Sequence, residues 1–293
     1  QALEDVSLSI APGITGRLGP NGAGKTTLIK VILGLVRVQH GWGEVLGYRL
    51  GQQAREIRAR VGYMPEDDCY LAGLSGVEMV QFVAQLSGLP AVEALRRAHE
   101  ILDFCGVEQE RYREAETYST GMRQKLKFAQ AIVHDPPFLI LDEPTAGLDP
   151  EEREAMLARV HVLATRAGKA VLLSTHILPD VQSICQHVII LARGRVRVAD
   201  RLEILHQPLA PAYHVRVLGD ADRLAERVRR EGIQVQTNEP GTLTLQGADV
   251  HVAQQVWTWA REAGVGVRSL VPARNSLEQI FLDAVGEQHR AHS

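Results

Sequence analysis

The stretch Gly19-Pro-Asn-Gly-Ala-Gly-Lys-Thr26 matches the phosphate-binding loop pattern G-x-x-x-x-G-K-[ST] at every position. Its three glycines allow successive backbone N–H groups to turn toward one point, which forms a concave site for an anion. Lys25 adds a positive charge for the β- and γ-phosphates, and the hydroxyl of Thr26 is placed to bind Mg²⁺. The stretch therefore predicts a site for a nucleoside triphosphate.

Apolar residues on both sides of this loop predict a strand before it and a helix after it. Ile14–Leu18 can supply the strand, and Thr27–Leu35 carries apolar residues at helical spacing. The N-terminal end of such a helix favours a bound phosphate, because the backbone dipole places partial positive charge there. We therefore expect the loop at a strand-to-helix junction.

The composition limits the classes of protein to consider. The chain has 293 residues, of which 45% are hydrophobic, and this is enough for a core and for two domains. Its net charge of −3, from 32 basic and 35 acidic residues, provides no overall attraction to nucleic acid or anionic lipid. The cysteines Cys69, Cys105 and Cys185 form no C-x-x-C pair, which fits a reducing cytosol. Neither a membrane-spanning apolar run nor a secretion signal is recognisable.

The first two thirds of the chain, residues 1–205, alternate short apolar runs with helical patterns, which predicts an α/β sheet. Phe138–Leu141, Ala170–Ser174 and Val188–Ala192 are nearly continuous apolar runs, as expected for strands buried on both faces. An α-rich insert of about residues 74–130 interrupts this pattern. We therefore expect an α/β core with a helical insert.

The pattern changes after a short proline-containing segment, residues 206–211, which we interpret as a linker. Residues 212–293 then contain segments in the order β-α-β-β-α-β, followed by an amphipathic helix that begins after Ser276. This order predicts a small α+β, ferredoxin-like accessory domain.

Two carboxylates follow the apolar run that begins at Phe138. At a phosphate site, Asp142 would hold Mg²⁺ and Glu143 would orient or deprotonate the attacking water. Upstream, Ser119 precedes Gly121 at the start of another helical pattern, where a hydroxyl and free backbone N–H groups can bind an anion. The chain thus carries three separate elements suited to phosphate chemistry.

Five motifs in a fixed order resemble those of the nucleotide-binding subunit of ABC transporters. After the phosphate loop and the Ser-x-Gly segment come Leu141-Asp-Glu-Pro-Thr145, Gly147-Leu-Asp149 and Ser174-Thr-His176. The resemblance covers about residues 1–205 and implies a P-loop NTPase fold, an ABC cassette with a RecA-like α/β core. The tail segment Ser276-Leu-Glu-Gln-Ile-Phe-Leu282 is similar to the accessory domain of ABC-2-type exporter ATPases.

The resemblance implies a role for each matched residue. In the family two cassettes bind head to tail around two ATP molecules, so Ser119 and Gly121 would contact the γ-phosphate held by Lys25 of the partner subunit. Asp149 would link the two sites, and His176 would bind the γ-phosphate and position the water. The catalytic residues would be Glu143 and His176, and the metal ligands Thr26 and Asp142. Nucleotide contacts are implied for Gly19, Pro20, Asn21, Gly22, Ala23, Gly24, Lys25, Thr26, Thr27, Glu66, Ser119, Thr120, Gly121, Met122 and Asp149.

The chain departs from the family pattern in three places. Met122 stands where the family usually has glutamine, and it cannot make the same hydrogen bond. Glu66 replaces the glutamine that senses Mg²⁺ and the membrane partner; its carboxylate can still bind the metal, or it can be an exposed loop acid. No adenine-stacking aromatic precedes the first strand, so either an N-terminal strand is missing from this chain or base stacking is weak.

The function implied is an ATPase subunit that uses ATP and Mg²⁺ to power export through a separate ABC-2-type membrane permease. It would act at the cytoplasmic face of the membrane, as a homodimer or as a heterodimer with a second cassette. The alternative is a soluble ABC ATPase that acts on ribosomes or DNA. Against it, the chain has one set of motifs, no sustained heptads and no basic stripe, so no nucleic acid partner is expected.

Overall fold

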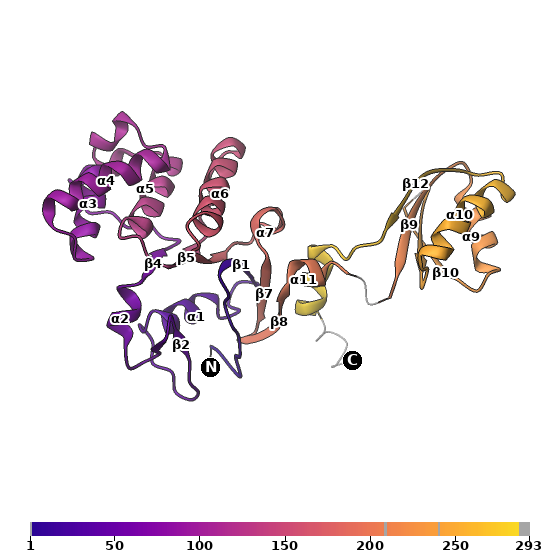
Figure 1. The fold of residues 1–293 in the computed structure, drawn as a ribbon, viewed down its shortest axis with the longest axis horizontal. Coiled ribbons are helices and arrows are strands. Elements are labelled where there is room, and N and C mark those ends of the chain that lie inside the picture. Colours follow the sequence, from indigo (N-terminus) through magenta and orange to yellow (C-terminus); the bar gives the residue numbers. More distant parts are fainter. Residues whose placement is uncertain (1, 208–209, 240, 287–293) are drawn as a thin grey trace. The chain divides into compact units, whose positions relative to one another are not determined.

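The computed structural model describes residues 2–207, 210–239 and 241–286, and these divide into two compact units (Figure 1). The first unit consists of two segments, the residues up to Leu202 and those from Phe281 onward. The second unit is Glu203–Ile280. Residues 208–209 of the predicted linker, Pro240 and residues 287–293 of the predicted accessory domain lie outside the described residues.

A six-stranded sheet with the order β4-β5-β6-β1-β7-β8 forms the centre of the first unit. Neighbouring strands from β4 to β7 are parallel, and β8 pairs antiparallel with β7. Three of these strands contain the apolar runs that the sequence predicts, and those residues are almost all buried. The strands of this sheet are β1 Gly13–Leu18, β4 Val61–Met64, β5 Phe138–Asp142, β6 Ala170–Ser174, β7 His187–Ala192 and β8 Arg195–Arg201. A separate hairpin joins β2 Glu44–Val45 and β3 Tyr48–Arg49.

Helices cover both faces of this sheet (Figure 1). One face packs on α1, through a core that includes Ile29, Ile140 and Leu172. The other face carries α5 and α6, and the predicted α-rich insert between β4 and β5 consists of α3, α4, two 3-10 turns and α5. The helices of this unit are α1 Lys25–Ile32, α2 Ala54–Arg58, α3 Gly76–Leu86, α4 Ala91–Cys105, α5 Thr120–Ile132, α6 Pro150–Thr165 and α7 Leu178–Ile184, with 3-10 turns at Gln109–Tyr112 and Ala115–Thr117. A short helix, α8 Leu202–Leu205, begins at the boundary between the units.

The helix after the phosphate loop is shorter than the sequence predicts. It ends at Ile32, and Gly34 follows in the left-handed conformation with φ 68°. The N–H of Leu35 then donates to the carbonyl of Lys30, and Leu35 is 60% exposed. The prediction of a helix through Leu35 was wrong, because the left-handed glycine ends the helix before the apolar spacing does.

The second unit contains a four-stranded antiparallel sheet with the order β10-β11-β9-β12. Two helices, α9 and α10, pack on it through buried residues such as Leu224, Val228, Val256 and Trp259. The elements follow one another as β-α-β-β-α-β, the order expected from the sequence. They are β9 Ala212–Leu218, α9 Ala221–Arg229, β10 Gln234–Glu239, β11 Thr242–Gln246, α10 Val250–Glu262 and β12 Gly266–Pro272; α11 Leu277–Gly286 follows them.

Candidate nucleotide-binding site

The phosphate loop lies between the end of β1 and the start of α1, as the sequence predicts. Gly22 and Gly24 have φ values of 77° and 98°, which place the loop in the left-handed region that favours glycine. A Cβ atom on Gly24 would also lie 2.6 Å from the carbonyl oxygen of Ala2, so a larger residue there would strain the loop. Glycine-rich turns of this kind can present backbone N–H groups to an anion, and the N-terminal end of the following helix favours negative charge.

Lys25 is the cation of this loop. Its Nζ donates to the carbonyl oxygens of Gly19, at 2.7 Å, and Pro20, at 3.0 Å. Burial lowers the pKa of Lys25, the nearby Arg17 lowers it further, and the carboxylates of Glu143, Asp142 and Glu66 oppose this change. The lysine therefore lies within the electrostatic reach of three of the four acids that the sequence assigns to the site.

A row of three polar residues crosses the carboxyl ends of neighbouring strands. Asp142 of β5 is in register with Ser174 of β6, and Ser174 is in register with Arg17 of β1. Residues in register on parallel strands point to the same face of a sheet. Here it is the face that packs on α1.

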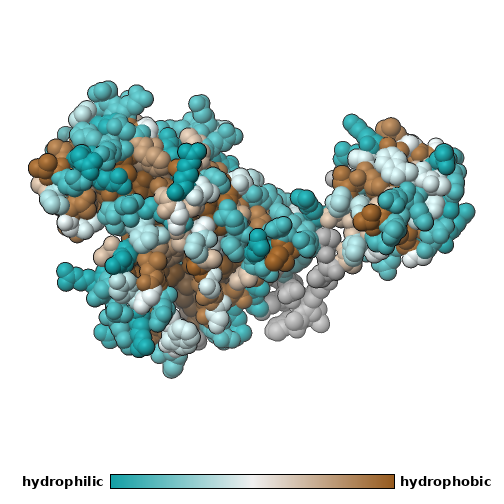
Figure 2. Space-filling view, in the orientation of Figure 1, coloured by the Kyte–Doolittle hydropathy of each residue, from teal (hydrophilic) through white to brown (hydrophobic). Residues whose placement is uncertain are grey.

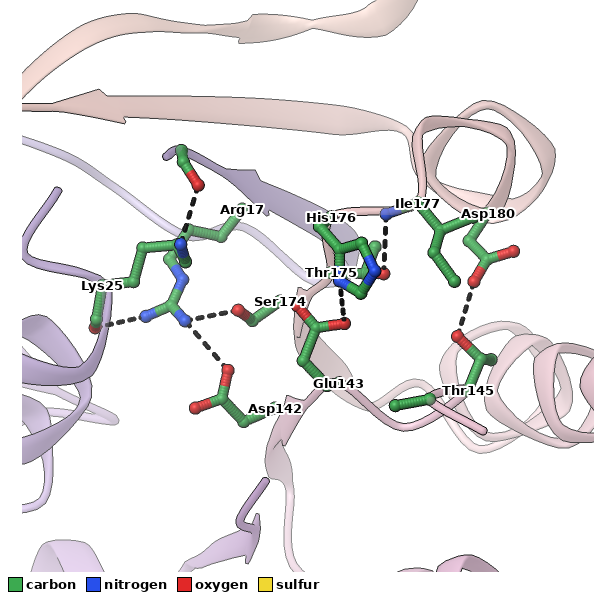
Figure 3. A network of polar contacts seen from close by, with 12 residues as sticks. Arg17, Lys25, Asp142, Glu143, Thr145, Ser174, Thr175, His176, Ile177 and Asp180 are labelled. Atoms are coloured by element: carbon green, nitrogen blue, oxygen red, sulfur yellow. Dashed lines mark hydrogen bonds and ion pairs between the residues drawn. The ribbon is translucent and has the colours of Figure 1, made fainter. Parts of the chain in front are cut away.

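Arg17 connects this row to the phosphate loop (Figure 3). One terminal nitrogen donates to Oδ1 of Asp142 at 3.1 Å and to the hydroxyl of Ser174, and the other donates to the carbonyl oxygen of Lys25. The arginine side chain is fully buried and Asp142 is nearly so. Burial lowers the pKa of Arg17, and the Asp142 charge opposes that shift. Sequence reasoning did not find Arg17, because its role depends on the pairing of strands far apart in the chain.

Glu143 and His176 form a pair beside this row (Figure 3). Glu143 follows β5 with φ 50°, and its N–H donates to the carbonyl oxygen of Ser174 at 2.8 Å. Its Oε2 lies 3.0 Å from Nδ1 of His176, whose side chain is 73% exposed. A buried carboxylate in contact with an exposed imidazole can orient a water molecule and accept its proton.

A second buried network supports the segment after Glu143. Asp180 of α7 accepts hydrogen bonds from the hydroxyl of Thr145 at 2.6 Å and from Nε of Arg153 at 2.6 Å. Thr145 and Asp180 are both almost fully buried. The network holds the start of α7 against the Glu143 segment, close to His176 in the chain (Figure 3). Asp180 could not be recognised from the sequence, because a single acid in an amphipathic segment is usually solvated.

The oxygen atoms near the loop fit a Mg²⁺ ion together with a nucleotide. Thr26 has an exposed side chain at the first turn of α1, and Asp142 lies at the end of a neighbouring strand. Oδ1 of Asp142 is held by Arg17, whereas Oδ2 has no hydrogen-bond partner among the described residues. Mg²⁺ is typically bound by one or two protein oxygens and otherwise by phosphates and water, which matches a site with Thr26 and Asp142.

Glu66 follows β4 and has an exposed side chain. Its backbone carbonyl oxygen accepts a hydrogen bond at 2.6 Å from Nζ of the buried Lys127. Since its carboxylate also raises the pKa of Lys25, Glu66 contributes negative charge to the surroundings of the phosphate loop.

The remaining predicted residues form a separate group. Ser119 caps α5 by accepting a hydrogen bond from the N–H of Met122 at 3.3 Å, and Asp149 caps α6 by accepting one from the N–H of Glu152 at 2.8 Å. A Cβ atom on Gly121 would lie 2.2 Å from Oε2 of Glu152, so the starts of α5 and α6 lie side by side. Within the described residues, no hydrogen bond or ion pair joins this group directly to the phosphate loop.

A phosphate loop at the end of a central strand, with an Asp-Glu pair at the end of a strand two places away, is the arrangement of a P-loop NTPase fold. The family model described as ABC transporter matches residues 3–146. An ABC transporter ATP-binding protein from Nostoc sp. is 35% identical over 292 residues, which cover 98% of this chain and 84% of the relative. The chain therefore belongs to the ABC transporter ATP-binding proteins.

Further relatives include proteins named for export and resistance. The Nod factor export ATP-binding protein I of Cupriavidus metallidurans is 31% identical, over 98% of this chain and 93% of its own length. The daunorubicin/doxorubicin resistance ATP-binding protein DrrA of Streptomyces peucetius is 30% identical, over 98% of this chain and 88% of its own length.

Solved structures agree with this fold. An ATP binding subunit of an ABC transporter has a TM-score of 0.64 and 34% identity, and the match covers 70% of this chain and 85% of that one. The dimeric ATP-binding cassette MJ0796, bound to ADP and Pi, has a TM-score of 0.63 and 23% identity, over 69% of this chain and 90% of that one. The predicted ABC cassette fold is thus confirmed.

Proposed function

We propose that this protein binds and hydrolyses ATP with Mg²⁺ to power export through a separate ABC-2-type membrane permease. The observation that carries the proposal is the pair of Glu143 and His176 at 3.0 Å, at the end of the strand that also bears Asp142. Relatives named for Nod factor export and for drug resistance match almost the whole chain and support export as the direction of transport.

Each residue near the loop has a distinct task in this proposal. The backbone of Gly19–Thr27 and the Lys25 ammonium bind the β- and γ-phosphates. Thr26 and Asp142 hold the Mg²⁺ ion, which neutralises charge on the phosphates when it is bound. Glu143 orients or deprotonates the attacking water, and His176 binds the γ-phosphate and keeps the water in place.

We also propose that two cassettes enclose the nucleotides between them. Ser119 and Gly121, with Thr120 and Met122, would bind the γ-phosphate held by the other subunit, and Asp149 would link the two sites. The separation of this group from the phosphate loop within one chain agrees with a site completed by a second subunit. That subunit is either another copy of this chain or a different cassette.

The variant Glu143→Gln tests the enclosed dimer. The amide has the same shape as the carboxylate but cannot accept a proton from water, so the nucleotide would remain bound and hold the two subunits together. In excess MgATP we expect a dimer by light scattering for Glu143→Gln and a monomer for the double variant Lys25→Ala/Glu143→Gln. A Glu143→Gln protein that stays monomeric would contradict the dimer mechanism.

The contact with the permease is proposed to lie on the helical insert, near Glu66. Apolar colour gathers over α3 and α4 on the surface in Figure 2. The exposed apolar side chains of this region include Leu86, 72% exposed, and Val92, 85% exposed, together with Phe82 and Leu95. Exposed apolar residues grouped in this way are typical of a protein contact surface.

None of the helices in the described part of the chain combines the length and the apolar character that crossing a bilayer requires. We propose that the permease holds the protein at the cytoplasmic face of the membrane. Purification from native membranes in mild detergent, followed by mass spectrometry, tests this directly. We expect a polytopic membrane protein in stoichiometric amount, lost in the double variant Leu86→Ser/Val92→Ser and kept in the control Trp42→Ser, since Trp42 is also exposed. Ribosomal proteins or DNA-bound factors instead would favour the soluble alternative.

We propose that residues 212–293 act as an accessory domain to the cassette of residues 1–205. Deletion of the chain from residue 212 tests whether the domain regulates turnover. An ATPase rate per cassette that differs from the full chain by more than about threefold would support regulation, and an equal rate would leave the domain a structural or docking role.

A further inference from the structure

The side chain of Arg17 spans an unusual distance for a residue on a central strand. Asp142 lies two strands away from Arg17, with Ser174 between them in the same row. Since neighbouring strands are about 4.8 Å apart, the two backbones are separated by roughly 10 Å. Serine leaves room over the middle strand, and only a long side chain can reach the carboxylate from β1. The row therefore lets the guanidinium of Arg17 reach the carboxylate of Asp142 across the intervening strand.

The position of Arg17 carries an energetic cost. Its side chain has no exposed surface, and Nε has no hydrogen-bond partner among the described residues. Burying a charged group with one donor unsatisfied is unfavourable, and an apolar side chain of the same length would avoid this. We take this cost as a sign that the guanidinium affects which other groups the Asp142 carboxylate can bind.

The guanidinium of Arg17 limits the binding of a cation by the Asp142 carboxylate in two ways. It holds Oδ1 of Asp142, which leaves Oδ2 as the oxygen without a partner among the described residues. It also brings a fixed positive charge to the carboxylate that would receive a divalent cation. Two like charges at such short range repel strongly in a buried site.

We propose that Arg17 is a positioning residue for Asp142 that keeps the affinity for Mg²⁺ low by sharing the carboxylate with the ion. This inference rests on the proposed function, in which Asp142 holds Mg²⁺. Arg17 also donates to the carbonyl of Lys25 at the start of α1, so it fixes the carboxylate relative to the phosphate loop. The ion thus adds less to nucleotide binding than it would beside an unshared aspartate.

The quantity to measure is the ratio of the Kd of a fluorescent ATP analogue in EDTA to its Kd in saturating Mg²⁺. This ratio reports the coupling between ion and nucleotide and needs no hydrolysis. In Arg17→Met, which keeps the length and removes the charge, we expect the ratio to rise at least about tenfold over wild type. Arg17→Gln serves the same purpose if the methionine variant does not fold, because its amide can replace some of the hydrogen bonds.

Two control variants separate charge from packing. Arg17→Lys keeps the charge and should leave the ratio within about threefold of wild type. Ser174→Ala removes one hydrogen bond from the same guanidinium and should change the ratio by less than about threefold. Both controls are expected to lower thermal stability. A variant that loses stability but keeps the wild-type Kd ratio therefore shows a purely structural effect of the substitution.

The outcomes distinguish the two levels of the proposal. If wild type binds the analogue and responds to Mg²⁺ but Arg17→Met and Arg17→Gln show an unchanged or lower ratio, the role given to Arg17 is wrong. If wild type does not bind the analogue, the proposed function itself fails. A raised ratio in the two uncharged variants, with little change in Arg17→Lys and Ser174→Ala, supports the inference.

Discussion

Truncation of Asp180 should destabilise the cassette, because this acid joins two elements inside it. Its carboxylate accepts from Thr145 at 2.6 Å and from Arg153 at 2.6 Å, and its side chain is only 2% exposed. In Asp180→Ala the buried hydroxyl of Thr145 loses its acceptor, which costs about 1–3 kcal/mol. Arg153 is 31% exposed and can turn to water, so the lost ion pair adds only about 1 kcal/mol.

The total for Asp180→Ala is therefore about 2–4 kcal/mol. For a folded unit of this size, that corresponds to a decrease in Tm of roughly 5–15 °C. Thermal unfolding followed by circular dichroism measures it. The control is Glu154→Ala on the same helix as Arg153, where an exposed side chain should change stability by less than about 0.5 kcal/mol.

A double-mutant cycle tests the contact itself. Thr145→Val keeps the shape of the side chain and removes its hydroxyl, so the effects of Thr145→Val and Asp180→Ala should overlap by about 1–2 kcal/mol in the double variant. Strictly additive effects would refute the direct contact. A Tm for Asp180→Ala within about 1 °C of wild type would refute the structural role of the network.

Three further variants or treatments test other parts of the molecule. His176→Ala should lower the rate of phosphate release about 100-fold or more without changing Tm, because its ring is exposed yet contacts Glu143, the proposed catalytic carboxylate; an unchanged rate would remove it from the mechanism. Gly62→Ala should cost about 3 kcal/mol or more, read as a lower urea midpoint, since a Cβ there would lie 2.0 Å from a carbonyl oxygen of α5; a wild-type midpoint would contradict this packing. Burial raises the pKa of the Cys105 thiol to about 12 and raises that of Cys185 as well, so at pH 8 both are protonated and should react with a thiol reagent only after unfolding. The half-buried Cys69 should react first, and equal rates for all three in the native protein would be inconsistent with the core.

Local sequence patterns predicted much of the fold because strands, loops and helix starts depend on residues that are close together in the chain. The apolar runs at Phe138–Leu141 and Ala170–Ser174 became central strands, and the phosphate loop lies at the predicted junction. The end of α1 was missed because the apolar spacing continues to Leu35, whereas the left-handed conformation of Gly34 decides where the helix ends.

The networks around the site could not be predicted, since they depend on contacts between distant segments. Arg17 reaches Asp142 only because β1, β6 and β5 are adjacent and in register, and a single sequence does not contain that register. Asp180 meets Thr145 through the packing of α7 on the segment after β5, which is equally non-local. The motifs predict which residues bind phosphate, while the strand order determines which other side chains contact those residues.

Phosphate release from MgATP by the purified protein tests the central claim most directly, with Lys25→Ala and Lys30→Ala as the paired variants. Both lysines lie on α1, but Lys25 bonds to the phosphate loop at the start of the helix, whereas Lys30 is exposed in the last turn. We expect turnover by wild type and Lys30→Ala, and loss of turnover by about 100-fold or more in Lys25→Ala. Equal rates for Lys25→Ala and wild type would show that this loop is not the site of ATP hydrolysis.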